Sequence, residues 1–100
     1  MSSSTLSEWG PIHPATLVVQ GLCDMELPEI NKKLGTNFKV VTALKFREQT
    51  WTLLPVPAMN FKILAKAQDD YMVVVIDLRI LKKPDLKEVE FQPNEEEPQF

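Results

Sequence analysis

Residues 14–35 have the sequence PATLVVQGLCDMELPEINKKLG, and this stretch decides the fold because it predicts a long amphipathic helix. Apolar side chains recur in it at spacings of 4, 4, 3 and 4, at Val19, Cys23, Leu27, Ile30 and Leu34. Leu22 and Met25 widen this apolar face. Thr16 is suited to cap the first turn, and Gly35 is suited to end the last one. We therefore predict one helix of about five turns.

Pro28 lies inside this predicted helix. A proline removes one helical hydrogen bond and costs about 3 kcal/mol unless the helix bends. The apolar pattern continues beyond it through Ile30 and Leu34. We therefore predict that the helix bends at Pro28 and does not end there.

After Gly35 the period of the apolar residues changes to two, which is typical of half-buried strands. Alternating runs are found at 38–47, 59–67, 71–80 and 86–91. In the first run one face would carry Phe38, Val40, Leu44 and Phe46. The connections around Gln68 and Pro84 have the composition of turns, so the strands should be antiparallel. These patterns predict an α+β fold in which the helix covers the apolar face of the sheet.

The length of 100 residues is that of one domain. We assign residues 1–92 to it, with 1–13 as a mobile N-terminal arm, and we expect 93–100 to form an acidic, flexible tail. The formal net charge of -3 and the dispersed lysines argue against nucleic acid as a partner. The longest apolar run, 72–76, is too short to cross a membrane.

The location that we expect is the cytoplasm. The first residues do not resemble a signal peptide. Cys23 is the only cysteine, so the chain cannot form an internal disulfide, and this fits a reducing compartment.

The residues that catalysis would need are missing from the sequence. His13 is the only histidine and falls in the predicted arm, and Cys23 falls on the apolar face of the helix. There is no glycine-rich phosphate loop and no Cys/His spacing typical of zinc. We therefore expect no enzymatic activity, no cofactor and no metal.

The segment between the first two long strands, residues 49–58, is longer and more apolar than a hairpin connection needs to be. One interpretation is that Trp51 and Leu53 extend the strand and pack in the core. The other is that Leu54 to Pro57 stand exposed at the tip, stiffened by two prolines. A rigid apolar projection loses little entropy on docking, so the second interpretation predicts a binding surface.

The order of these elements resembles the stefins, the type-1 cystatins, from about Leu6 to Phe91. From Gln20 to Gln49 the spacing matches that family without a gap. The residues that carry the likeness are Pro14-Ala15-Thr16, Gln20, Pro28, Lys32-Lys33, Ala43, Phe46, Asn60-Phe61 and Asp69 to Met72.

This resemblance implies the cystatin fold, an antiparallel sheet of four to five strands wrapped around one long bent helix. It also implies a reversible, competitive inhibitor of papain-like cysteine proteases, a monomer with a domain-swapped dimer as the alternative. In that family a wedge of three parts enters the protease cleft: an N-terminal arm and two hairpins. Here the corresponding residues are Ser4, Thr5 and Gly10 in the arm, Gln49, Thr50, Trp51, Thr52, Leu53, Leu54, Pro55, Val56 and Pro57 in the first hairpin, and Lys82, Lys83 and Pro84 in the second.

The first hairpin departs from the family's Gln-x-Val-x-Gly motif. Gln49 stands at its start, but Trp51 takes the valine position and Leu53 the glycine position, and about five extra residues follow. The alternative function is therefore a cystatin-fold binding protein, natural or an engineered scaffold, whose lengthened first hairpin binds a different protein.

Overall fold

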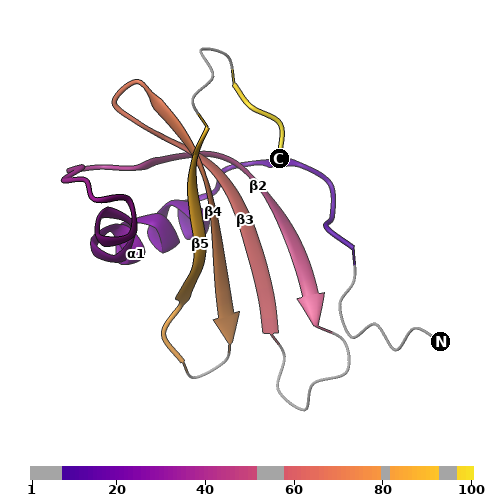
Figure 1. The fold of residues 1–100 in the computed structure, drawn as a ribbon. Coiled ribbons are helices and arrows are strands. Elements are labelled where there is room, and N and C mark those ends of the chain that lie inside the picture. Colours follow the sequence, from indigo (N-terminus) through magenta and orange to yellow (C-terminus); the bar gives the residue numbers. More distant parts are fainter. Residues whose placement is uncertain (1–7, 52–57, 80–81, 93–96) are drawn as a thin grey trace.

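The computed structural model describes residues 8–51, 58–79, 82–92 and 97–100, and it contains one helix and a five-stranded antiparallel sheet (Figure 1). The elements in chain order are β1 (His13–Pro14), α1 (Leu17–Leu34), β2 (Thr42–Trp51), β3 (Ala58–Ala67), β4 (Asp70–Arg79) and β5 (Asp85–Gln92). The strands lie side by side in this same order, and α1 packs across one face of the sheet. The predicted α+β architecture is confirmed, and it is cystatin-like. No helix in the described ranges is long and apolar enough to span a membrane.

Both predicted ends of α1 are confirmed. The backbone N–H of Val19 donates to Thr16 Oγ1 at 3.2 Å, which is the expected N-cap contact. Gly35 has φ 69°, and its N–H donates to the carbonyl of Asn31. A side chain is strained in this left-handed conformation, so glycine is the suitable residue for the helix end.

The helix continues through Pro28, as predicted. Ile30, beyond the proline, is fully buried, and Leu34 packs against the core. These contacts offset the hydrogen bond that proline cannot donate. The bend at Pro28 stays a prediction.

The buried face of α1 differs from the predicted one at two positions. Met25 is 59% exposed, so its assignment to the apolar face was wrong. The helical rotation of about 100° per residue places it beside Val18, which is also exposed, and away from Cys23. Glu26, the next residue, is buried among the core-facing residues of the helix, whereas Met25 is not.

Glu26 is a buried carboxyl group on the apolar side of α1. Burial raises its pKa, and the negative charges of Glu29 and Asp85 raise it further. The backbone hydrogen bond with Leu86, on β5, acts in the opposite direction. The carboxyl group therefore binds a proton more tightly in the folded chain than in the unfolded chain.

Replacing Glu26 with glutamine should stabilise the protein at neutral pH. Because the folded pKa is raised above 4.5, the wild-type free energy of unfolding falls as pH rises from that value through the folded pKa. The amide cannot titrate and can still accept the hydrogen bond from Leu86. Thermal melts from about pH 4 to about pH 8 should show a gain for E26Q that grows with pH, whereas the exposed control E88Q should show none. A gain of the same size at every pH would contradict this explanation.

The core lies between α1 and one face of the sheet. Its sheet residues include Phe46, Phe61, Ile63, Ala65, Met72, Val74, Ile76 and Leu86. They alternate with outward-facing residues along β3 and β4, as the sequence predicts.

The first predicted strand differs from the observed one because β2 begins only at Thr42 and contains a β-bulge. Ala43 pairs with Ala65, whereas Lys45 pairs with Leu64, so Leu44 is the extra residue. The bulge shifts the alternation by one position. Phe46 is buried as predicted, but Val40 is exposed and its neighbour Val41 is buried, so the prediction for Val40 was wrong.

Leu64 lies on the outer face of the sheet, the face away from α1, and yet it is fully buried. Its partners in register are Lys45 on β2 and Val73 on β4. Lys45 forms an ion pair with Glu97 at 2.6 Å, and the following residue, Pro98, is buried. We infer that residues 97–100 cover Leu64. Of the predicted tail, 93–96 lie outside the described residues.

Candidate functional site

The connection between β2 and β3 and the connection between β4 and β5 are at the same end of the sheet. Trp51 pairs with Ala58, and Ala58 pairs with Arg79, so these three strand ends lie in one row. The chain leaves Arg79 for the second connection and returns at Asp85. We call this end the hairpin edge, and Figure 1 shows the ends of β2 and β4 and the beginnings of β3 and β5 lying there.

The N-terminal arm runs toward the same edge. His13 pairs with Phe46, and the N–H of Gly10 donates to the carbonyl of Glu48 at 2.8 Å. Following the arm back from His13 therefore leads along β2 toward Trp51 (Figure 1). Of the predicted mobile arm, residues 8–13 lie along β2, while Ser4 and Thr5 lie outside the described residues.

The base of the first hairpin is held by strand pairing. Gln49 pairs with Asn60, and the Asn60 side-chain amide donates to Gln49 Oε1 at 3.1 Å. Thr50 pairs with Met59, and the ladder continues as far as Trp51. The remaining predicted residues of this hairpin, Thr52, Leu53, Leu54, Pro55, Val56 and Pro57, lie outside the described residues. The choice between a core loop and an exposed tip therefore stays a prediction.

The second hairpin presents positive charge. Lys82 and Lys83 are exposed, Pro84 is half-buried, and the Lys82 N–H donates to the carbonyl of Arg79 at 3.3 Å. Within the described ranges neither lysine takes part in an ion pair. The ammonium groups of these two lysines are therefore available to form ion pairs with acidic groups of a partner.

Beside these lysines lies a cavity of about 230 Å³ on the outer face. It is lined by Asp77, Arg79, Lys82, Lys83, Asp85 and Lys87. Arg79 Nε contacts Asp77 Oδ2 at 3.1 Å, and Lys87 Nζ contacts Asp85 Oδ2 at 2.8 Å. The second contact lowers the pKa of Asp85 and raises the pKa of Lys87. These two ion pairs neutralise Asp77 and Asp85, so the charges of Lys82 and Lys83 remain as an excess of positive charge beside the cavity. The sequence does not show this excess, because it does not show which charged residues form pairs.

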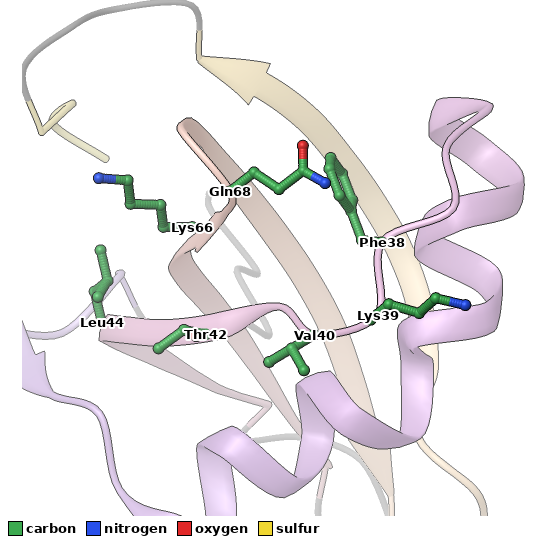
Figure 2. Close-up of a pocket in the computed structure, with 7 residues that line it drawn as sticks. All are labelled: Phe38, Lys39, Val40, Thr42, Leu44, Lys66 and Gln68. Carbon is green, nitrogen blue, oxygen red and sulfur yellow. The ribbon is translucent and has the colours of Figure 1, made fainter.

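A second cavity, of about 450 Å³, is at the opposite end of the sheet from the hairpin edge, beside the turn between β3 and β4. It is lined by Phe38, Lys39, Val40, Thr42, Leu44, Lys66 and Gln68. Figure 2 shows the ammonium groups of Lys39 and Lys66 pointing away from one another, so they do not converge on one ligand group. None of the residues predicted for binding lines this cavity.

Of the two residues considered for catalysis, Cys23 is buried as the sequence predicts, whereas His13, which was assigned to the arm, forms part of the short strand β1. His13 is exposed on β1, with its ring 5.5 Å from the ring of Phe46. Cys23 is fully buried, and burial together with the negative charge of Asp24 raises the pKa of its thiol to about 12. The described part of the chain has no group of three His, Cys, Asp or Glu residues arranged to hold a metal ion.

Cys23 should not react with a thiol reagent while the protein is folded. The thiolate is the reactive form, and at neutral pH the buried thiol is almost entirely protonated. We expect labelling of the native protein to be at least about 100-fold slower than labelling in denaturant, because it requires unfolding. Measuring both rates by mass spectrometry tests this, and comparable rates would contradict it.

A scan of protein-family models found no match to the chain, and a search of curated proteins found no significant match. The likeness to cystatins is therefore one of fold: an N-terminal helix packed against a five-stranded antiparallel sheet.

Proposed function

We propose that this protein is a reversible, competitive inhibitor of papain-like cysteine proteases, which inserts the hairpin edge and the arm into the active-site cleft. The observation that supports the proposal is the strand register. It brings Gly10, Gln49 to Trp51 and Lys82 to Pro84, which are far apart in the sequence, to one end of the sheet.

The strand pairing and hydrogen bonding of the described residues at this edge also favour an inhibitory role. The strands β2 and β3, which carry the first hairpin, are paired as far as Trp51 and Ala58. The arm is hydrogen-bonded to β2 at Gly10. Preordered segments lose less entropy on binding than mobile ones. Blocking a cleft requires neither a nucleophile nor a metal, so the buried, protonated Cys23 is no obstacle to it.

The second candidate is a cystatin-fold binding protein with a different protein partner. The observation in its favour is the chemistry of the edge: Trp51 and Leu53 replace the motif residues, and Lys82 and Lys83 add positive charge. An enlarged loop on a conserved type of scaffold is a natural place for a new specificity.

The two candidates are separated by titrating papain with the protein. The inhibitor proposal predicts complete loss of activity toward a peptide substrate, with an apparent inhibition constant that rises linearly with substrate concentration. The variant V40S is a matched control, because Val40 is exposed at the opposite end of the sheet. This variant should inhibit papain as strongly as the wild type does. Absence of inhibition at micromolar concentration would favour the second candidate.

The cytoplasm remains our proposed location for this activity. The only cysteine, Cys23, is buried as a free thiol, which is compatible with a reducing compartment.

A further inference from the structure

The two described ends of the chain meet at one side chain on the outer face of the sheet. Arg47 Nε donates to the carbonyl of Gly10 at 2.7 Å. Arg47 Nη1 donates to the main-chain oxygen of Phe100 at 2.8 Å. The guanidinium of Arg47 therefore connects the N-terminal arm directly to residues 97–100, which we call the strap.

The strap has further contacts with the outer face. Glu97 forms an ion pair with Lys45, two residues before Arg47 on β2. Pro98 is buried, and Gln99 and Phe100 line a cavity of about 210 Å³. The other residues that line this cavity come from β3, β4 and β5, among them Lys62, Val73 and Glu90. The strap is thus joined to β2 by the ion pair and shares a cavity with the three strands beyond it.

A second contact joins the arm to the same region. Lys62, which lines the cavity together with Gln99 and Phe100, places its ammonium group 4.6 Å from the centre of the Trp9 ring. Trp9 directly precedes Gly10, so two adjacent residues of the arm contact side chains that also face the strap. The Lys62 contact holds the arm to the sheet, and the hydrogen bonds from the arm to the strap run through Arg47.

The geometry of arginine explains how the strap can influence the arm. A guanidinium group is planar, and its N–H donors have fixed directions. An oxygen that accepts from Nη1 therefore fixes the direction in which Nε points. The Phe100 oxygen holds the plane of Arg47 in the orientation that the hydrogen bond to Gly10 requires.

We infer that the strap holds the N-terminal arm at the hairpin edge through Arg47, which acts as a positioning residue for partner binding. The part of this inference that concerns binding rests on the proposed function, because it takes the arm as one of the surfaces that contact the protease. The part that concerns the arm itself needs no partner. Loss of the strap frees the arm, and the arm must then be ordered during binding.

The first experiment measures hydrogen exchange of the Gly10 amide, which donates to Glu48, in the protein alone. Three chains are compared: the wild type, R47Q, and a chain that lacks residues 97–100. We expect exchange at Gly10 to be roughly tenfold faster in both altered chains, since each loses a charge-assisted hydrogen bond. The amide of Ile63, in the core, serves as the control for global stability.

The shortened chain is the decisive variant, because it retains both Arg47 and Gly10. Faster exchange at Gly10 with unchanged exchange at Ile63 supports transmission from the strap to the arm. A chain that combines R47Q with the deletion should show the same exchange rate at the Gly10 amide as R47Q alone. Unchanged exchange at Gly10 in the shortened chain would overturn the inference, whether or not papain is bound.

The second experiment measures the dissociation constant for papain with the same chains and with K45Q, which removes the ion pair to Glu97 and leaves Arg47 in place. We expect about tenfold weaker binding for R47Q and for the shortened chain, and a smaller loss for K45Q. Faster exchange at Gly10 with unchanged affinity would overturn the role in binding. Failure of the wild type to bind papain would instead count against the proposed function, and the exchange data would still decide the coupling.

Discussion

Replacing Leu53, Leu54 and Val56 together with serine is expected to abolish inhibition of papain and to change the free energy of unfolding by less than about 0.5 kcal/mol. The last pair of the β2–β3 ladder is Trp51 with Ala58, so the three aliphatic residues follow the end of the paired strand. If they form an exposed tip, they supply apolar contact area to the partner and none to the core. A loss of about 1,000-fold or more in affinity would then be accompanied by an unchanged thermal melt.

The core interpretation of the same loop forecasts the opposite result. Truncating buried aliphatic residues costs roughly 2–5 kcal/mol each, which would exceed the stability of many domains of this size. A large decrease in melting temperature for the triple variant would therefore show that the loop belongs to the core. The variant V40S provides the control, because it places a serine at an exposed valine far from the hairpin edge.

The helix could be predicted from the sequence because its signals are local. Thr16 and Gly35 act within one turn of the chain, and the apolar spacing repeats over several turns. Met25 was assigned wrongly, and the burial of Glu26 was not predicted, because the pattern does not show which side of a broad apolar face will meet the sheet. Glu26 is tolerated there since the backbone of Leu86, which is distant in sequence, provides a hydrogen bond.

The sheet was predicted in outline, but its details depend on contacts between distant residues. Alternation identified β3 and β4, whereas the bulge at Leu44 could not be seen, because a bulge exists only relative to the partner strand. The short strand β1 has only two residues, which is too few for a period to be recognised.

For the candidate site, those residues selected by the resemblance that lie in the described ranges are brought to one edge of the sheet by the observed register, and their role in binding stays a prediction. The resemblance did not indicate the meeting of Gly10, Arg47 and Phe100, because no local pattern in the sequence connects positions so far apart. It also missed the positive surplus near Lys82, which arises only when neighbouring charges have formed their own ion pairs.

Leu64 is a residue whose burial the alternating pattern does not predict. Alternation with Ile63 and Ala65 places it on the polar outer face, yet it is fully buried. We expect Leu64→Ala to reduce the free energy of unfolding by roughly 2–5 kcal/mol, as for a core residue. Urea denaturation of the variant and the wild type measures this difference.

The matched control for Leu64→Ala is Glu90→Ala, in the same row of the sheet. Leu64 pairs with Val73, and Val73 pairs with Glu90, which is exposed. The control should change stability by less than about 0.5 kcal/mol. An equally small effect at Leu64 would contradict a buried layer on the outer face. If residues 97–100 form that layer, the cost of Leu64→Ala should be smaller in the shortened chain, because part of the buried area at Leu64 is already lost there.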